Sequence, residues 1–331
     1  MNGEKVIDYW GEHASAKREY TLKAIAGTDY KIRIEYMQAG AEALLRFDLG
    51  IYRHISPEMV VDRVKEADIV IFAGGISPSL EGEEMYSVNS PGFAGGDRTS
   101  IELPQVQRDI LKALKKAGKK VVFVNCSGSA VALVPEMESC DAILQAWYPG
   151  QSGGLAVADV LFGDFNPSGK LPVTFYKNTD QLPDFEDYSM KNRTYRYMTE
   201  VPLFPFGYGL SYTTFDISKG RLNKKTISAG QDLNFKVNVK NTGKYDGAEV
   251  IQVYVRKVDD AEGPIKSLRA FRRVPLKAGE TCVVSIDLLP TTFEFFDPTT
   301  NTMRIMPGKY EIMYGNSSDI PSGNKLSVTL R

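Results

Sequence analysis

A short apolar segment that leads directly into a long acidic connection is the feature that most constrains the fold of this chain. Residues 67–75 read Ala-Asp-Ile-Val-Ile-Phe-Ala-Gly-Gly, which is typical of a buried strand ended by two glycines. The next strong helical pattern begins only near Glu102, so the connection covers residues 76–101. Most strand-to-helix connections have only a few residues. Because ligands of open α/β sheets bind at the carboxyl ends of strands, a long acidic loop there favours acid/base chemistry.

Residues 53–178 are predicted to form an α/β domain. Ser56-Pro57 has the pattern of a helix start. Apolar segments typical of strands alternate with segments of helical periodicity. The strands are expected at 67–73, 120–125, 141–147 and 170–175, and the helices at 102–117, 130–138 and 153–162. This alternation predicts an α/β fold with a doubly wound, mostly parallel sheet.

Three further parts flank this domain. Residues 1–52 contain three alternating segments, at 19–25, 30–36 and 43–49, which predict part of a β domain too small to build its own core. Residues 179–210 are rich in proline and aromatic residues, which predicts an ordered connector. Residues 211–331 predict an all-β sandwich of the immunoglobulin or fibronectin III type, with strands expected at 232–240, 249–255, 281–287 and 308–314.

The composition argues against several classes of function. A net charge of -1 over 331 residues gives no reason to expect a nucleic-acid partner. No apolar run is long enough to span a membrane. The 3 cysteines lack metal-ligand spacing and only 2 histidines are present, so we predict no metal site, no cofactor and no histidine-based triad.

The acidic connection contains three candidate carboxylates, Glu81, Glu83 and Glu84. They are compatible with a solvated acidic loop, with a cation site, or with a general acid/base in a loop near a cleft. The cation site is disfavoured because the segment lacks the alternating Asp/Asn pattern of a calcium loop. The residues alone leave the solvated loop ahead of the acid/base.

Two pairs of residues at the ends of predicted elements are candidates for substrate binding. Asp97 and Arg98 follow Gly95-Gly96 at the far end of the acidic connection. They could attach the loop to its base through an ion pair, which we favour, or position a polar substrate. Trp147 and Tyr148 follow the third predicted strand. Such aromatic rings stack on sugars, although they more often pack in a core or at its rim.

Several motifs within residues 67–215 resemble the C-terminal half of family 3 glycoside hydrolases, which are β-glucosidases and β-xylosidases. They are Ala-Gly-Gly-Ile-Ser-Pro-Ser-Leu-Glu-Gly-Glu-Glu (73–84), Gly-Gly-Asp-Arg-Thr-Ser-Ile-Glu-Leu-Pro (95–104), Val-Phe-Val-Asn-Cys-Ser-Gly-Ser (122–129), Gln-Ala-Trp-Tyr-Pro-Gly-Gln-Ser-Gly-Gly (145–154), the segment from Ala158 to Phe175, and Phe-Pro-Phe-Gly-Tyr-Gly-Leu (204–210). The resemblance implies that the downstream sandwich is the family's fibronectin III-like domain and that residues 1–52 are the tail of a PA14-type insert.

The resemblance assigns the general acid/base to Glu81, with Glu83 and Glu84 as alternatives. It implies a retaining enzyme that hydrolyses terminal β-linked glucose or xylose from oligosaccharides. The family carries its nucleophilic aspartate on an N-terminal (β/α) barrel, and nothing in this sequence resembles that barrel. We therefore expect the chain to be part of a larger enzyme, inactive by itself, with the barrel as its partner. The resemblance also favours a periplasmic or extracellular location for the full-length enzyme.

Two other classes of function stay open at this point. A noncatalytic carbohydrate-binding or scaffolding module would carry the same aromatic residues without using Glu81. A nucleotide-binding domain is compatible with the α/β pattern, but no Gly-x-Gly-x-x-Gly or phosphate loop follows the first strand. We rank the nucleotide-binding domain lowest.

Overall fold

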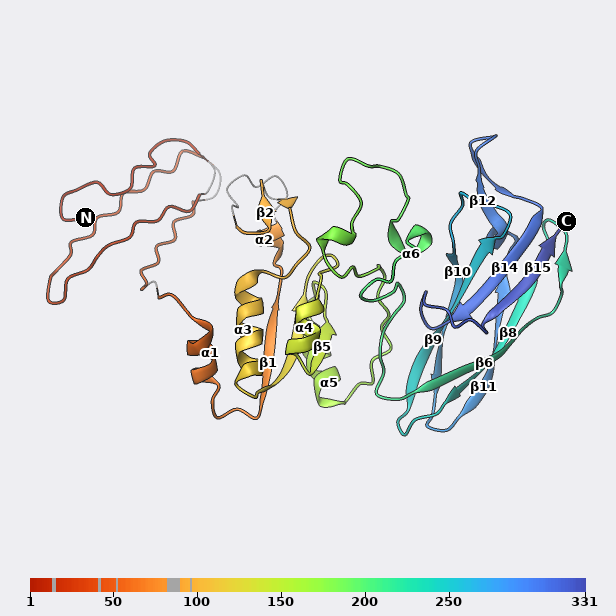
Figure 1. Cartoon of the computed structure of the whole chain (residues 1–331). Helices are drawn as coiled ribbons and strands as arrows, with labels where there is room; N and C mark the ends of the chain where they lie inside the picture. The colour runs from red at the N-terminus through yellow and green to blue at the C-terminus, as the bar shows by residue number, and fades with distance from the viewer. Residues whose placement is uncertain (14–15, 41–42, 52, 82–89, 96) are drawn as a thin grey trace. The chain divides into compact units, whose positions relative to one another are not determined.

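The protein is described by a computed structural model that covers residues 1–13, 16–40, 43–51, 53–81, 90–95 and 97–331. It divides into two units, residues 1–54 and residues 55–331 (Figure 1), and each is described by itself. Glu83 and Glu84 lie outside the described residues.

The first unit contains no helix or strand among its described residues. The strands predicted at 19–25, 30–36 and 43–49 are therefore wrong. A sheet of short strands needs a covered apolar face, and the apolar side chains here, such as Ile25 and Leu49, are exposed. Two hydrogen bonds still join distant residues of this unit. The Asn2 backbone N–H donates to the Lys31 carbonyl at 2.9 Å, and the Lys31 backbone N–H donates to the Asn2 side-chain oxygen at 2.7 Å. Its relation to a PA14-type domain stays a prediction.

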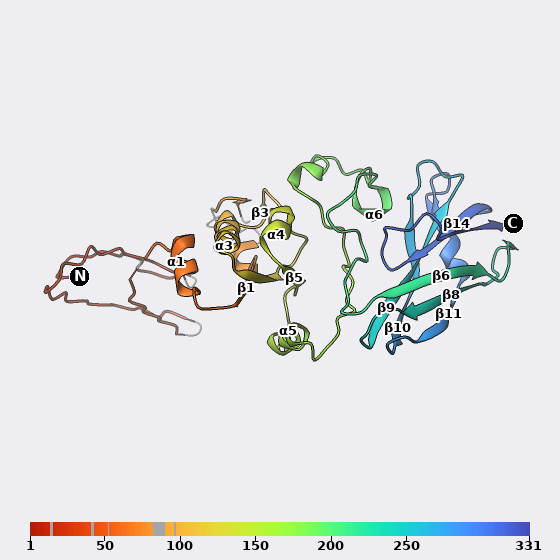
Figure 2. The ribbon, with the colours of Figure 1, turned by 60° about the horizontal axis from the view of Figure 1, so that its bottom comes forward.

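The α/β part is built on a parallel three-stranded sheet in the order β1-β4-β5. The strands are β1 (Ile69–Gly75), β4 (Lys120–Cys126) and β5 (Ala142–Gln145). The helices are α1 (Pro57–Arg63), α3 (Gln105–Lys116), α4 (Val134–Ser139) and α5 (Gly153–Phe162). Figure 2 shows α3 and α4 on the same side of the sheet. The predicted fold class, a mixed α/β domain with a parallel sheet followed by a sandwich, is confirmed.

The periodicity of α3 determines how the helix packs. Leu111 and Leu114, three residues apart, share one face of the helix and are fully buried against Val121 and Phe123 of β4. The helix ends at Lys116, and Gly118 just beyond it has a φ of 75°, in the left-handed region that favours glycine. This packing fixes α3 against β4.

The strand predicted at 170–175 is wrong, because its backbone pairs with the connector and not with the parallel sheet. Phe175 forms an isolated antiparallel bridge to Phe204, and the Leu171 N–H donates to the Tyr208 carbonyl at 2.8 Å. Pro172 lacks an N–H and so cannot continue a ladder of hydrogen bonds.

The connection between β1 and α3 contains three short elements among its described residues. They are α2 (Pro78–Glu81), β2 (Phe93–Ala94) and β3 (Asp97–Arg98). Further along the chain, the connector contains η1 (Thr179–Gln181) and α6 (Thr194–Tyr197). Aromatic rings pack within it, since Tyr195 stacks on Phe206 and Phe204 on Tyr208, with centroid distances of 4.3 and 5.2 Å.

The C-terminal region is a sandwich of two mainly antiparallel sheets. One sheet has the order β10-β9-β14-β15-β7 and the other has the order β11-β8-β6. The strands are β6 (Phe215–Leu222), β7 (Thr226–Ile227), β8 (Leu233–Asn241), β9 (Gly247–Lys257), β10 (Ser267–Leu276), β11 (Thr281–Leu288), β14 (Gly308–Gly315) and β15 (Lys325–Leu330). A short helix η2 (Pro290–Phe293) and a two-stranded sheet of β12 (Glu294–Asp297) and β13 (Thr302–Ile305) complete it.

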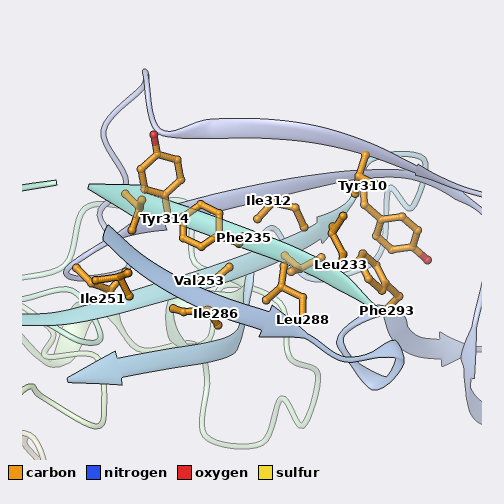
Figure 3. Packing of buried hydrophobic residues seen from close by; sticks show 14 of the residues in the cluster. Leu233, Phe235, Ile251, Val253, Ile286, Leu288, Phe293, Tyr310, Ile312 and Tyr314 are labelled. Carbon is orange, nitrogen blue, oxygen red and sulfur yellow. The ribbon is translucent and has the colours of Figure 1, made fainter. Parts of the chain in front are cut away.

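The core of the sandwich follows the alternation of its strands. In β8, Leu233, Phe235 and Val237 are fully buried while Lys236 between them is exposed. Figure 3 shows side chains of β8 and β11 meeting those of β9 and β14, so both sheets contribute to one apolar layer. The predicted strands at 232–240, 249–255, 281–287 and 308–314 are confirmed as β8, β9, β11 and β14.

Candidate active site

Glu81 is the last residue of α2, directly downstream of the carboxyl end of β1. Ser77 begins this single turn of helix, because its backbone carbonyl accepts the Glu81 N–H at 3.0 Å and its hydroxyl accepts the Leu80 N–H at 3.2 Å. The Glu81 side chain is 22 % exposed. The chain therefore holds the carboxylate at the edge of the sheet where ligands of α/β domains bind.

Three side chains surround this carboxylate, one from the far end of the same connection and two from other loops. The Tyr148 hydroxyl donates to Glu81 Oε2 at 2.5 Å, and the Ser129 hydroxyl donates to Glu81 Oε1 at 3.2 Å. The Arg98 guanidinium lies 4.0 Å from Glu81 Oε1. Because Ser129 follows β4 and Tyr148 follows β5, the carboxyl ends of all three strands contribute to one site.

Gly128 leaves room for the close approach of the Tyr148 ring to Glu81. A Cβ at Gly128 would lie 2.6 Å from a ring carbon of Tyr148 and 3.1 Å from Glu81 Oε2. The first of these distances is too short for a Cβ atom, so a larger residue at position 128 would displace the Tyr148 ring. Sequence reasoning assigned no role to Gly128 or Ser129, although both lie in the Val-Phe-Val-Asn-Cys-Ser-Gly-Ser motif.

Arg98 attaches the end of the acidic connection to the β4 loop. It donates to the Ser129 hydroxyl at 2.8 Å, to the Ala130 carbonyl at 3.3 Å and to the Ser100 carbonyl at 3.2 Å. Burial lowers the pKa of Arg98, while the charges of Glu81 and Glu102 act in the opposite direction. One of its terminal nitrogens, Nη2, is buried without a hydrogen-bond partner among the described residues.

Of the other three residues predicted to bind substrate, only Tyr148 contacts Glu81. Asp97 is exposed, and no hydrogen bond or ion pair of its side chain is found in the described part of the chain. Trp147 is half-buried and packs edge-on against Phe175 at 6.0 Å, as part of the apolar core. Tyr148 is 38 % exposed and points its hydroxyl at Glu81. The structure thus brings Glu81, Arg98 and Tyr148 together but not Asp97 or Trp147.

Burial and the neighbouring Glu81 raise the pKa of Tyr148 to about 12. The phenol therefore keeps its proton at every pH at which the protein would be assayed. It acts as a hydrogen-bond donor to the carboxylate and not as a base.

A chain of polar side chains supports the Ser129 loop from below. Buried Asn125 donates to Gln145 at 2.6 Å, Gln145 donates to the Ser127 hydroxyl at 3.1 Å, and Ser127 donates to the Ser129 carbonyl at 2.8 Å. Such linked hydrogen bonds restrict the positions of the groups that they join. The loop that offers a hydroxyl to Glu81 is therefore held by both β4 and β5.

Gln107 of α3 holds the other side of the site. Its side-chain oxygen accepts the Gly75 N–H at 2.8 Å and its nitrogen donates to the Gly75 carbonyl at 2.7 Å. The backbone N–H of Ile76 in turn donates to the Cys126 carbonyl at 2.8 Å. These contacts fix the point at which the chain leaves β1 toward Glu81, and the sequence pattern did not indicate them.

Within the described residues, no group of three or more histidine, cysteine, aspartate or glutamate side chains could hold a metal ion. No helix in the described parts is both long and apolar enough to cross a membrane. An open hollow lined by Phe165, Asn166 and Arg273, among others, includes none of the residues around Glu81.

A parallel α/β domain with a hydrogen-bonded glutamate at its carboxyl edge, followed by a β sandwich, is an architecture found in glycosidases. The chain belongs to glycoside hydrolase family 3, since the family description "Glycosyl hydrolase family 3 C-terminal domain" matches residues 5–212. A second description, "Fibronectin type III-like domain", matches residues 249–318.

Individual glycosidases that resemble this chain agree with this assignment. A xylan 1,4-β-xylosidase of Xylanibacter ruminicola is 56% identical over 93% of this chain and 36% of its own length. A periplasmic β-glucosidase of Salmonella typhimurium is 38% identical over 80% of this chain and 35% of its own length. A solved β-glucosidase from Erythrobacter marinus superposes with a TM-score of 0.72 at 34% identity, covering 83% of this chain and 36% of that chain. The chain thus spans about a third of the length of these relatives.

Proposed function

We propose that this chain is the C-terminal part of a retaining β-glycosidase and that it supplies the general acid/base, Glu81. The observation that supports this role is the convergence of Tyr148, Ser129 and Arg98 on one carboxylate at the sheet edge. Retaining hydrolysis needs two carboxyl groups about 5–5.5 Å apart, one nucleophile and one acid that later acts as a base. The nucleophile would come from a barrel domain outside residues 1–331.

In this mechanism Glu81 protonates the glycosidic oxygen as the bond to the leaving group breaks. It then accepts a proton from the water that attacks the glycosyl–enzyme intermediate. Arg98 and the neutral Tyr148 hold the carboxylate between these steps. The substrate would be a terminal β-linked glucose or xylose, and the 56% identity to a xylan 1,4-β-xylosidase favours testing β-xylosides first.

Exposed apolar side chains are consistent with a further domain on this part of the chain. Ile69 and Ile71 on one face of β1 are exposed, as are Leu155 and Phe162 of α5. Aliphatic and aromatic groups of this size are normally covered when they lie on a strand or helix of a sheet domain. The periplasmic relative supports a periplasmic or extracellular location for the full-length enzyme.

The first test measures activity of the chain alone. Purified residues 1–331 should not hydrolyse an aryl β-xyloside or aryl β-glucoside above background. Turnover that disappears in Glu81→Gln would contradict the proposal that the nucleophile lies outside this chain.

The second test uses the full-length enzyme that contains this chain and the barrel. Glu81→Gln should lower kcat by about 10²- to 10⁴-fold on substrates with a poor leaving group. It should affect the first step little on dinitrophenyl glycosides, which need no acid. Azide should then restore turnover by forming a β-glycosyl azide, because a small anion needs no general base.

Three matched variants complete this test. Glu138→Gln, at an exposed position of α4, should leave activity unchanged. Glu83→Gln and Glu84→Gln distinguish Glu81 from its neighbours. If the azide-rescued variant were one of these two, the acid/base role would move from Glu81 to that residue.

A further inference from the structure

A cluster of cationic side chains lies where the connector meets the sandwich, in a part of the chain that contributes nothing to the Glu81 site. We call Arg196, Ser267 and Arg269 the Arg196–Arg269 cluster. The Arg196 carbonyl accepts the Ile265 N–H at 2.8 Å, which ties α6 to the segment just before β10. The neighbouring Tyr195 hydroxyl accepts the Leu268 N–H at 3.1 Å. These two bonds hold Arg196 beside the start of β10, where Ser267 and Arg269 lie.

Each member of this cluster has a buried polar atom without a partner. Nε of Arg196, Nε of Arg269 and Oγ of Ser267 make no hydrogen bond to any described residue. They are three of the six buried side-chain atoms of this kind in the described part of the chain. Ser267 is only 5% exposed. Because a buried donor without an acceptor costs about 1–3 kcal/mol, three of them on two adjoining segments indicate an acceptor that this chain does not itself supply.

The cluster also carries positive charge that no nearby carboxylate neutralises directly. Arg269 uses another nitrogen to donate to the Glu294 carbonyl at 2.6 Å, and its guanidinium lies 4.9 Å from the ring centroid of Phe295. Among the described residues, neither arginine forms an ion pair. Burial lowers the pKa of Arg269, and the charge of Arg196 lowers it further, while Glu294 acts in the opposite direction. The half-buried Arg269 guanidinium therefore experiences the charge of Arg196 without an ion-pair partner of its own.

The backbone around the cluster departs from regular geometry on both sides. The ladder between β10 and β9 is interrupted between Leu268 and Ala270, so Arg269 is the extra residue of a β-bulge. Asn192 and Thr194, just before Arg196, both have φ of 57°, which is unfavourable for the β-branched threonine. Bulges change the direction of a side chain, and strained residues cluster at binding sites. Both departures affect the segments that present the two arginines.

We propose that the Arg196–Arg269 cluster binds a small oxyanion, either a carboxylate or a phosphate group. A guanidinium is planar and matches the paired oxygens of such groups. One anion would accept from Nε of both arginines and from the Ser267 hydroxyl, and would neutralise the repulsion between the two cations. The ligand class therefore follows from the donors that this chain leaves unpaired.

The test observes the two unpaired N–H groups directly. The Nε–H signals of Arg196 and Arg269 in ¹⁵N-labelled residues 1–331 are assigned by Arg196→Lys and Arg269→Lys, which keep the charge. Sodium phosphate is titrated against sodium chloride at the same ionic strength. Both signals should shift in phosphate with one common, saturating midpoint and should not shift in chloride. Each lysine variant should weaken binding, read at the remaining arginine, by about tenfold, since lysine lacks the fork of donors.

A parallel titration with sodium acetate distinguishes the two classes of oxyanion. Tighter binding of acetate identifies a carboxylate site, and tighter binding of phosphate identifies a phosphate site; either result supports the proposal. Arg221→Lys, at an exposed position of β6, is the control and should change neither midpoint. Circular dichroism verifies that each variant is folded. If the Nε–H signals move no further in phosphate or acetate than in chloride, or move without a common midpoint, the proposal is wrong.

Discussion

The Glu81 carboxylate receives hydroxyl donors from two loops that are distant in sequence. Tyr148 and Ser129 donate to different oxygens, so the group is held in one orientation. Tyr148 also stays neutral, because its pKa is raised to about 12 by burial and by Glu81. A neutral donor orients the Glu81 carboxylate without adding a charge that would compete with Arg98.

We predict that Tyr148→Phe lowers the free energy of unfolding by no more than about 1 kcal/mol, because the lost hydrogen bond is partly exposed to water. The pKa of Tyr148 in the folded protein, about 12, lies above the ordinary value of 10.0. The stabilisation is therefore complete below pH 10 and declines as the pH rises through about 12. Denaturant unfolding from pH 7 to pH 11 measures it.

Tyr188→Phe is the control for this experiment, because Tyr188 is 91% exposed. It should unfold like the wild type at every pH. A stability difference for Tyr148→Phe that grew above pH 10 would contradict the assigned hydrogen bond.

Glu102 holds the end of the acidic connection to the connector. Burial opposes its ionisation, but hydrogen bonds from Ser100 and from the side chain and backbone of Thr179 lower its pKa to about 2. Because the folded-state pKa lies below the ordinary value of 4.5, this stabilisation is present above pH 4.5 and is lost as the pH falls toward 2.

We predict that Glu102→Gln lowers the free energy of unfolding by about 2 kcal/mol at pH 7. It should also make the stability less dependent on pH between about 4.5 and 2, which acid unfolding followed by circular dichroism measures. Glu138→Gln, which is exposed, should keep the steeper wild-type dependence. Parallel acid-unfolding curves for wild type and Glu102→Gln would argue against this role.

At the scale of elements, local periodicity predicted the helices and strands whose burial alternates cleanly. α3 and β8 were predicted because apolar residues recur every three to four and every two residues, respectively. β10 and β15 were not predicted: the face of β10 is interrupted by the bulge at Arg269, and β15 has only 6 residues. Edge and bulged strands depend on pairing with distant neighbours, which a sequence pattern does not contain.

The candidate site was predictable only in part for a similar reason. Glu81, Arg98 and Tyr148 lie in recognisable motifs next to predicted strand ends, so their importance could be inferred. The support from Gln107 and Asn125 could not, because both residues lie within an element where a polar side chain usually faces solvent. Their partners are fixed only when α3 packs behind β1 and β4.

The exit of β1 depends on a glycine whose conformation no other residue readily adopts. Gly75 has φ of 122°, and a Cβ there would overlap the backbone of Cys126 on the neighbouring strand. Gly118 has a φ of 75°, but a Cβ at this position would meet no atom within 4 Å. Substitutions at these two positions therefore distinguish the cost of steric overlap, expected at Gly75, from the cost of an unfavourable φ alone, expected at Gly118.

We predict that Gly75→Ala destabilises the protein by more than about 3 kcal/mol, because the strands must separate. Gly118→Ala should cost only about 1 kcal/mol. Thermal and denaturant unfolding of both variants measure the difference. Equal effects would show that the overlap at Gly75 relaxes without cost.

At the scale of the whole molecule, the segment after α5 joins the α/β part to the sandwich through polar contacts. Asn166 accepts the Tyr212 N–H and the Ser211 hydroxyl, both at 2.8 Å, and donates to the Asp246 carbonyl at 2.9 Å. Buried Gln252 of β9 donates to the Gly207 carbonyl at 3.0 Å. Within residues 55–331, the connector is therefore packed as part of the sandwich and does not behave as a free linker.

A buried ion pair tests whether this attachment stabilises the fold. Lys170 Nζ lies 2.7 Å from Glu249 Oε1, and the side chains are only 11% and 6% exposed. Lys170 also donates to the Gly209 carbonyl, and Asn316 donates to the other oxygen of Glu249, each at 3.0 Å. Removing one member leaves a buried charge unpaired, which costs more than losing the pair.

We predict that Glu249→Gln lowers the free energy of unfolding by about 3 kcal/mol. The double variant Lys170→Met, Glu249→Gln should be less destabilised than Glu249→Gln alone, because no cation is then left buried. Denaturant unfolding of the single and double variants gives the coupling energy between the two residues. If the two substitutions were simply additive, Lys170 and Glu249 would not be coupled, and the connector would be held to β9 by its hydrogen bonds alone.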